Sequence, residues 1–287
     1  MKTYKIKNML LPVDFSKSNH SAVKTAVAIC KRQNSKLTLI HVIDKTNMAD
    51  SPPSSDVGFV TFKEFQKHVH KELKALASQI SKSSKLEVNS YVEIGTPSEI
   101  IRNYAEKDNA SIIVMGAHGK SGNTDKMGSV AFNVVTGAAC PVMVVPGNWN
   151  HEKFNKIVYP IRMDQKVFEK FNYIQPIIEK NNSELIIAGL ANKDNTEHIS
   201  KTVFSIDLLR EMCQEEKIEY STIVFPSNNF SSKVVETANK INADLIVISS
   251  HINYDSEVNF LEAFARTILD ESKCPVLCIS PLINKRK

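Results

Sequence analysis

The stretch Met115-Gly116-Ala117-His118-Gly119 follows an apolar run at residues 110–114 (ASIIV) and lies eight residues before Gly128-Ser129. The apolar run predicts a buried strand of a parallel sheet, and the pattern at 130–136 predicts a helix. A glycine-rich loop between the carboxyl end of a strand and the start of a helix is a place to hold phosphate. Its glycines admit a close backbone approach, and the free N–H groups and helix dipole favour negative charge. The alternative is a tight turn in which the glycines supply positive φ.

The chain contains this pattern twice. Four pairs of segments match in the same order: residues 7–14 and 156–163, 37–42 and 185–190, 110–118 and 243–251, and 140–145 and 274–279. Such an ordered repeat predicts two homologous halves, which we expect at residues 1–147 and 152–287. The link between them, Pro146 to Asn150, is short and rich in turn-forming residues.

Strands alternate with helices within each half. In the first half we expect strands at 6–13, 36–43, 86–93, 110–115 and 141–145, and helices at 18–33, 61–82, 97–107 and 129–138. This alternation predicts a parallel sheet with helices on both faces. The expected fold class is therefore α/β, with two Rossmann-like or flavodoxin-like doubly wound domains of five parallel strands each. We expect a pseudo-twofold axis between them, with the last strands, 141–145 and 275–279, at the interface.

The carboxyl ends of the strands, where the strand order switches, form the ligand crevice of this class. Pro12, Val13 and Asp14 end the first strand, Val42 ends the second, and Met115 ends the fourth. If the first and fourth strands flank the switch point, an adenosine fits there. Asp14 would accept hydrogen bonds from ribose hydroxyls or hold a metal, while Val13, Val42 and Met115 enclose the base.

Backbone N–H groups are the expected phosphate ligands. Those of residues 116–119 and 128–130 surround the glycine loop, and the Ser129 hydroxyl adds a further donor. Ser16 or Ser18 is expected to cap the first helix. The complete set of expected site residues is Pro12, Val13, Asp14, Val42, Met115, Gly116, His118, Gly119, Gly128, Ser129 and Val130.

Composition places the chain among globular proteins. It has 287 residues, of which 42% are hydrophobic and 23% charged, enough for two domains with cores of their own. The net charge of +5 looks spread along the sequence, so we expect no nucleic-acid partner. Five cysteines without metal-type spacing indicate free, buried thiols in a reducing cytoplasm. No apolar stretch approaches the roughly 20 residues that span a bilayer, so we expect no membrane partner.

With these residues the sequence resembles the universal stress protein family. The matching features are the opening LLPVDFS, the strand LTLIHVID, the turn GTPSEII, and the segment IIVMGAHGKSG with MGSVAFNVV and CPVMVV after it. The resemblance implies a tandem member with two such domains in one chain. Family members pair as dimers, so a tandem chain can form the pair internally, and a homodimer of the whole chain is a further expectation.

The ATP-binding branch of the family has Gly-x-x-Gly, nine residues, and then Gly-Ser or Gly-Thr. The resemblance implies that Gly116, Gly119 and Gly128-Ser129 hold phosphates in this chain. It also implies that Asp14 lies near ribose and phosphate and that Val42 contacts adenine. One departure is the spacing, because eight residues and not nine separate Gly119 from Gly128.

The second half departs further from this pattern. The position of Asp14 is occupied by Arg162 or Met163, according to how the strand ends are aligned. The four phosphate-loop positions become Ser249, Ile252, Glu262 and Ala263. Ile252 resists positive φ, and Glu262 would bring a negative charge to the phosphates. We therefore expect this half to keep the fold without the ATP site, with Asp164 as an alternative carboxylate.

These observations favour a regulatory protein that binds ATP, or AMP or ADP, in its first half, with Mg²⁺ as the candidate metal. Any hydrolysis is expected to be slow, because no general base is evident for an attacking water. One alternative is a phosphotransferase or nucleotide-dependent ligase, against which the chain lacks a P-loop lysine motif. Another is an interaction module without nucleotide. His118 and His251 occupy matching positions but have no further metal ligands by spacing.

Overall fold

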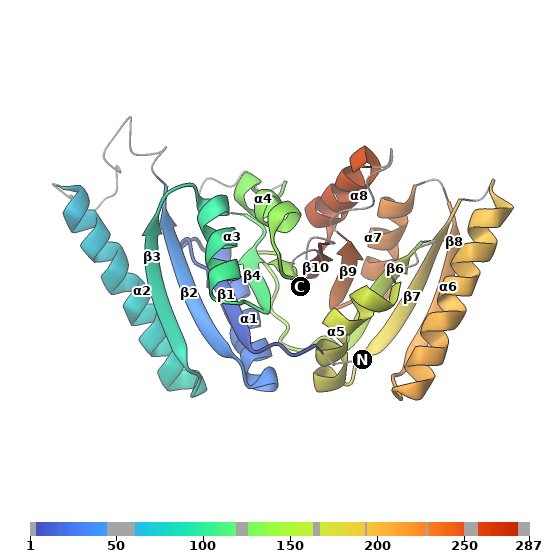
Figure 1. Cartoon of the computed structure of the whole chain (residues 1–287), viewed down its shortest axis with the longest axis horizontal. Coiled ribbons are helices and arrows are strands. Elements are labelled where there is room, and N and C mark those ends of the chain that lie inside the picture. The colour runs from blue at the N-terminus through green and yellow to red at the C-terminus, as the bar shows by residue number, and fades with distance from the viewer. Residues whose placement is uncertain are drawn as a thin grey trace.

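The computed structural model describes residues 4–44, 61–118, 126–162, 167–192, 194–227, 229–249 and 258–280, with backbone only at 167–169, 226 and 258–262. The first half contains β1 (Asn8–Pro12), α1 (Asn19–Gln33), β2 (Lys36–Ile43), α2 (Phe62–Ser84), β3 (Val88–Ile94), α3 (Pro97–Lys107), β4 (Ile112–Gly116), α4 (Ser129–Gly137) and β5 (Val142–Val145). The second half contains β6 (Lys156–Ile161), α5 (Val167–Asn181), β7 (Glu184–Ala191), α6 (Thr196–Glu215), β8 (Tyr220–Pro226), α7 (Phe230–Lys240), β9 (Leu245–Ser249), α8 (Val258–Glu271) and β10 (Val276–Ile279). Strands and helices alternate throughout, as the sequence predicts (Figure 1).

Local signals explain where the first-half helices begin and end. Thr61 and Glu64 form a reciprocal capping box at the start of α2, and Pro97 occupies the first turn of α3. The C-cap residues of α1 and α2 are Asn34 and Lys85, both in the left-handed conformation that closes a helix C-terminus. These signals are readable in the sequence, so the predicted helices lie close to the observed ones.

The strands form one sheet in the order β3-β2-β1-β4-β5-β10-β9-β6-β7-β8. Within each half the order is 3-2-1-4-5, which is Rossmann-like and not flavodoxin-like. All pairs inside a half are parallel, whereas β5 and β10 pair antiparallel. The predicted α/β class and the predicted contact between the last strands are confirmed, and that contact makes the two five-stranded sheets continuous (Figure 1).

The pairing at this join has a local twofold symmetry. The pairs are Val142–Cys278, Met143–Leu277 and Val144–Val276. Met143 and Leu277 occupy the same position in the repeated segments CPVMVV and CPVLCI, and the flanking pairs exchange when the halves are interchanged. An axis between Met143 and Leu277 therefore relates the two strands, as in an isologous dimer interface.

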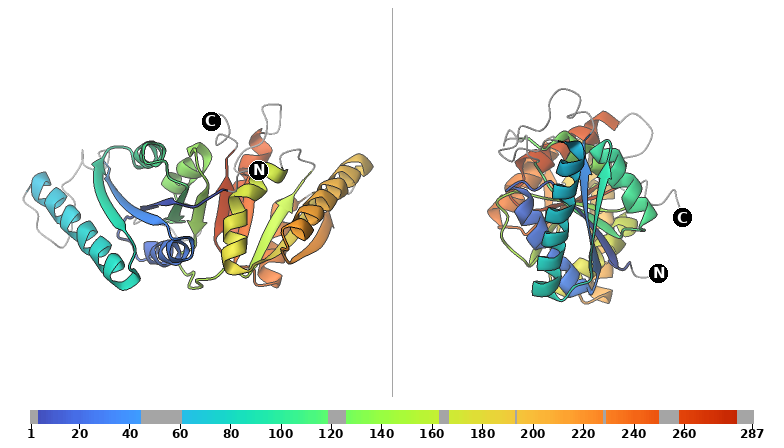
Figure 2. Two further views of the ribbon diagram at one scale, coloured as in Figure 1. Left: turned by 60° about the horizontal axis from the view of Figure 1, so that its bottom comes forward. Right: turned by 90° about the vertical axis from the view of Figure 1, so that its left-hand side faces the viewer.

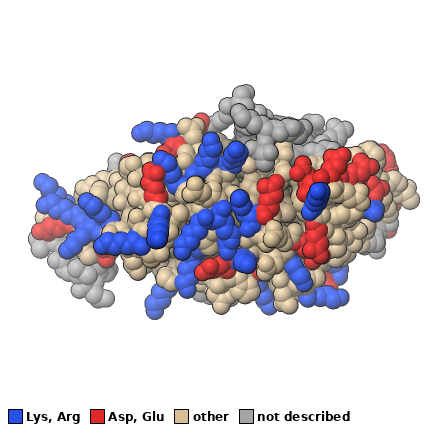
Figure 3. Space-filling model, turned by 90° about the horizontal axis from the view of Figure 1, so that it is seen from below, with Lys and Arg blue, Asp and Glu red and all other residues tan. Residues whose placement is uncertain are grey.

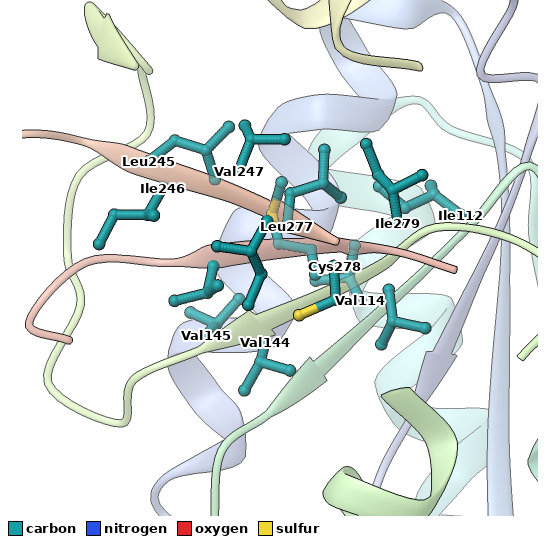
Figure 4. Packing of buried hydrophobic residues seen from close by; sticks show 14 of the residues in the cluster. Ile112, Val114, Val144, Val145, Leu245, Ile246, Val247, Leu277, Cys278 and Ile279 are labelled. Carbon is teal, nitrogen blue, oxygen red and sulfur yellow. The ribbon is translucent and has the colours of Figure 1, made fainter. Parts of the chain in front are cut away.

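The join is part of the hydrophobic core. Met143 and Leu277 are fully buried, and Val144 is 2% exposed. Figure 4 shows Leu277 and Cys278 of β10 beside Val144 and Val145 of β5, with Val247 of β9 nearby. Because the apolar contacts run without interruption from one sheet into the other, the two halves share one core cluster.

Helices cover both faces of the sheet. In the first half α1 and α2 pack together on one face, and α3 and α4 pack together on the other; the second half repeats this with α5 and α6 against α7 and α8 (Figures 1 and 2). No helix of the described ranges has the length and apolar character required to cross a bilayer. All five cysteines are buried and free, as the sequence predicts.

The link between the halves is anchored to both. The Ser21 hydroxyl of α1 donates to the Gly147 carbonyl at 2.8 Å, and His151 Nδ1 lies 3.2 Å from Asp244 Oδ1 beside β9. Between them Trp149 is 8% exposed. These contacts hold residues 147–151 against the molecule.

Charge is less evenly distributed than the sequence suggested. Seen from below, Lys and Arg gather over the first half, whereas Asp and Glu are denser over the second (Figure 3). The expectation of a charge spread along the chain is therefore wrong for this face. The difference arises because the surface positions of the repeated elements carry different residues in the two halves.

Candidate functional site

The topological switch point, where the sequence predicts the crevice, lies where β1 separates β2 from β4. These three strands are parallel neighbours, so their carboxyl ends meet at one edge of the sheet. The Val13 N–H extends the β1–β2 ladder by donating to the Ile40 carbonyl at 2.8 Å. The first and fourth strands flank the switch point, which brings the segment after Pro12 close to the segment after Gly116.

Asp14 is half-buried at the end of β1 and shapes the turn into α1. Its Oδ1 accepts hydrogen bonds from the Ser16 N–H at 2.9 Å and from the Ser16 hydroxyl at 2.7 Å. This is the local pattern by which aspartate stabilises a turn. Within the described part of the chain no hydrogen bond reaches the second oxygen, Oδ2, so one oxygen of the carboxylate is committed to the turn.

A short run of polar contacts continues from Asp14 to the His118 carbonyl, and the two serine hydroxyl hydrogens fill two of its three oxygen–oxygen contacts at a time. The Ser16 hydroxyl lies 2.9 Å from the Ser18 hydroxyl, and Ser18 Oγ lies 3.0 Å from the His118 carbonyl oxygen. Ser16 Oγ also accepts from the Asn19 N–H at 3.2 Å, so Ser16 caps α1, while Ser18 at the N-cap position makes no cap bond. The sequence predicted a capping serine but not the connection to His118, which joins residues 100 positions apart.

The start of α4 has no side-chain cap and is bonded to the residue before His118. Gly128 is the N-cap residue, with φ −64° and ψ 147°, and its N–H donates to the Ala117 carbonyl at 2.9 Å. The N–H groups of the first helical turn, at Ser129 and Val130, have no acceptor within their own helix. Ser129 is exposed and Val130 half-buried.

Neither Gly116 nor Gly128 has the positive φ that the tight-turn alternative requires. Gly128 is extended, and Gly116 is outside the left-handed region. A Cβ at Gly116 would lie 3.6 Å from the His118 oxygen and 3.8 Å from the Ser18 oxygen, which is ordinary contact. The tight-turn alternative is therefore wrong for these two positions, and Gly119 lies outside the described residues.

The residues expected around the base are unequally accessible. Val13 and Met115 are each 5% exposed and lie in the core, whereas Val42 is half-buried. Sequence reasoning missed Phe15, whose ring lies 5.1 Å from the His41 ring and whose backbone has φ 59°. His41 Nδ1 lies 2.6 Å from the Val13 carbonyl oxygen, which fixes the imidazole beside the end of β1.

His118 is half-buried at the end of β4, and its Nδ1 is buried without a hydrogen-bond partner in the described ranges. Its carbonyl accepts from the Ser18 hydroxyl, so residue 118 is held through its backbone. The described residues contain no group of three His, Cys, Asp or Glu side chains that could hold a metal ion.

Strand pairing aligns the second half with this site. The pairs that fix the alignment are Met9–Ile112 in the first half and Ile157–Leu245 in the second. Counting forward from these pairs makes Arg162, and not Met163, the counterpart of Asp14. The Arg162 guanidinium lies 5.2 Å from the centre of the Phe230 ring, so a cation replaces the carboxylate. Met163 and Asp164 lie outside the described residues, as do Ile252 and His251.

The helix at the second crevice also begins differently. Ala138 and Ser272 directly follow α4 and α8, and the N–H of each donates to the carbonyl four residues earlier. The two residues are therefore equivalent, and counting back from them makes Glu262 the counterpart of Gly128. However, α8 already begins at Val258, so residues 262–264 lie inside it. The backbone N–H groups at the start of α4 have no acceptor in their own helix. Their counterparts in α8 lie inside the helix, where carbonyls four residues earlier can accept them. The expected loss of the phosphate site has this second physical cause besides the charge of Glu262.

Comparison with known proteins agrees with this architecture. The model of the universal stress protein family matches residues 5–146. A universal stress protein of Methanocaldococcus jannaschii is 30% identical over 142 residues, which cover 48% of this chain and 81% of that protein. A relative from Staphylococcus aureus, also named a universal stress protein, is 33% identical over 148 residues, which cover 50% of this chain and 86% of the relative.

The chain belongs to the universal stress protein family. The fold of the whole chain is shared with the crystal structure of a universal stress protein from Archaeoglobus fulgidus. The two align with a TM-score of 0.74 at 17% identity, over 97% of each chain. The second half therefore has the fold of a family member in the arrangement seen in a solved structure, although the family model matches the first half.

Proposed function

We propose that this universal stress protein is a regulatory protein of the stress response that binds one adenine nucleotide, in its first half. The observation that carries the proposal is the run of polar contacts from Asp14 through Ser16 and Ser18 to the His118 carbonyl, with the uncapped start of α4 bonded to the neighbouring Ala117. A carboxylate for ribose or metal and a helix N-terminus for phosphate then share one crevice.

The proposed roles follow from the geometry. Asp14 Oδ2 accepts from the ribose hydroxyls or contacts Mg²⁺ held by the phosphates, while Oδ1 keeps the turn. The N–H groups of Ser129 and Val130, with those that follow Gly116, hold phosphates. Val42, half-buried at the end of β2, contacts the base, and the Phe15–His41 ring pair extends this wall. Val13 and Met115 support the wall from the core, and the half-buried Pro12 lies beside them at the end of β1.

Binding and not turnover is the proposed activity. The sequence shows no evident general base for an attacking water, and the His41 Nδ1 is engaged with the Val13 carbonyl. ATP, ADP and AMP remain the candidate ligands. We also propose that residues 1–147 and 152–287 are the two domains. The five buried free thiols support a reducing, cytoplasmic location.

The proposal can be tested without knowing the ligand in advance. The protein is purified rapidly in Mg²⁺-containing buffer, and the small molecules released by denaturation are identified by mass spectrometry. We expect an adenine nucleotide in the wild-type sample and none in Gly128→Glu, since that variant brings the acid of position 262 to the start of α4. Arg162→Ala, at the counterpart of Asp14, is the matched control and should retain the nucleotide. An empty wild-type protein that also fails to bind added ATP, ADP or AMP would favour the alternative of an interaction module.

A further inference from the structure

The second half contacts the segment that leads into α4. Asp270, in the last turn of α8, accepts a hydrogen bond at Oδ1 from the Met127 N–H at 2.7 Å. The next N–H, that of Gly128, donates to the Ala117 carbonyl of the first half at 2.9 Å. Two consecutive backbone N–H groups, directly before the first turn of α4, are thus held by the two halves of the molecule.

This contact has no copy across the pseudo-twofold axis. The alignment of α4 and α8 makes Thr136 the counterpart of Asp270. The Thr136 hydroxyl donates to the Phe132 carbonyl at 3.0 Å, inside its own helix. Asp270 instead bonds to the first half, which contains Asp14, Gly116 and Gly128. The bond is therefore a difference between the two halves and not a feature of the fold that they share.

The surroundings make the bond a strong constraint. Met127 is 7% exposed and Asp270 is half-buried, so water competes little for the N–H. A bond from an N–H to a carboxylate is shorter and stronger than one between neutral groups. Next to it, the Arg266 guanidinium lies 4.9 Å from the centre of the Phe132 ring, and these two residues are counterparts that meet across the axis.

We propose that Asp270 is a positioning residue through which the second half fixes the start of α4 and so sets the affinity of the first-half crevice for phosphate groups. The inference rests on the proposed nucleotide function. It gives the half without a site a role in binding: its carboxylate orients Met127 and Gly128, and the first-turn N–H groups of α4 follow from that orientation. Asp270 itself would touch no nucleotide.

If Asp270 acted only through its negative charge, removing it would strengthen ATP binding, whereas a positioning role predicts weaker binding. Variants of Asp270 can therefore distinguish the two effects. Asp270→Asn keeps an oxygen acceptor for the Met127 N–H but removes the negative charge, whereas Asp270→Ala removes both. We expect Asp270→Ala to weaken ATP binding about fivefold or more, in the range of ordinary coupling between sites, and to leave adenosine binding unchanged. Asp270→Asn, whose neutral amide oxygen makes a weaker bond to the Met127 N–H, should bind ATP more tightly than Asp270→Ala. If both variants bind ATP equally well or better than the wild type, the positioning role is overturned.

A control separates this bond from the interface around it. Arg266→Ala removes the contact with Phe132 but leaves the Met127–Asp270 bond in place, and it should leave ATP affinity unchanged. An equal loss in Arg266→Ala and Asp270→Ala would mean that the whole contact between α4 and α8 matters and would overturn a specific role for Asp270. Thermal melting of all variants confirms that they are folded.

Hydrogen exchange gives a readout that needs no nucleotide. We expect faster amide exchange at residues 127–131 in Asp270→Ala than in Asp270→Asn or the wild type. If the wild type binds no nucleotide, the proposed function fails, and faster exchange in Asp270→Ala would still support the coupling between the halves. Unchanged exchange in Asp270→Ala would overturn that coupling.

Discussion

Replacing Asp14 tests the proposed site most sharply, because its two oxygens have separable roles. Asp14→Ala removes the acceptor of two hydrogen bonds from Ser16, at 2.9 and 2.7 Å. Hydrogen bonds to a charged group contribute about 1.5–3 kcal/mol, and the half-exposed position weakens them. We therefore expect the free energy of unfolding to fall by about 2 kcal/mol and ATP affinity to fall about tenfold or more.

Asp14→Asn separates the turn from the ligand. The amide oxygen can still accept both bonds from Ser16, so stability should stay within about 1 kcal/mol of the wild type. The lost charge should still weaken ATP binding about tenfold. If ribose is the partner, adenosine and ATP are weakened alike; if Mg²⁺ is the partner, the magnesium dependence of ATP affinity disappears.

The assay pairs urea unfolding with titration calorimetry for each variant, with Arg162→Ala as the control at the equivalent position of the second half. Arg162→Ala should leave ATP affinity unchanged. An Asp14→Asn protein with wild-type stability and wild-type affinity for both ligands would refute the reasoning, because Asp14 would then serve only the turn before α1.

Three further predictions concern the loop, the join and the thiols. Gly128→Glu should reduce ATP affinity more than about a hundredfold by like-charge repulsion, whereas Glu262→Gly should create no second site, since α8 begins at Val258; calorimetry of both variants checks this. Leu277→Ala, at a fully buried position on the pseudo-twofold axis, should lower the free energy of unfolding by about 2–5 kcal/mol in urea titrations, and a loss below about 1 kcal/mol would contradict the burial of the join. Burial raises the pKa of Cys30 and Cys140 from 9.0 to about 12, so the folded thiols stay protonated above the pH at which unfolded thiols ionise. Stability should therefore be full below pH 9 and fall by up to about 1.4 kcal/mol per pH unit for each thiol above it, with a smaller fall in Cys140→Ala; urea unfolding that is independent of pH between 8 and 11 would contradict this.

Much of the fold could be predicted because its signals are local. The buried strands are apolar runs, and α2 has its capping box in the sequence at Thr61 and Glu64. The strand order could not be read in this way, since Rossmann-like and flavodoxin-like sheets use the same alternation of elements. The pairing of β5 with β10 was predictable from the repeat, because two copies of an apolar last strand can cover each other.

The candidate site could be proposed from the sequence where one residue type implies one role. Asp14 and Gly128 were found from the sequence, and the structure brings their segments together. The hydrogen bonds from Ser18 to His118 and from Met127 to Asp270 join residues more than 90 positions apart, so only the folded chain shows them. Phe15 was missed because a bulky residue with positive φ has no sequence signal. The early start of α8 was missed because the two halves were aligned by their strands.

The central claim is that one crevice of two binds an adenine nucleotide. Titration calorimetry of the wild-type chain with ATP and Mg²⁺ tests it directly, with the same titration of Gly128→Glu to locate the site. We predict one site per chain in the wild type and none in Gly128→Glu. Two equal sites, or one site that survives Gly128→Glu, would contradict the account.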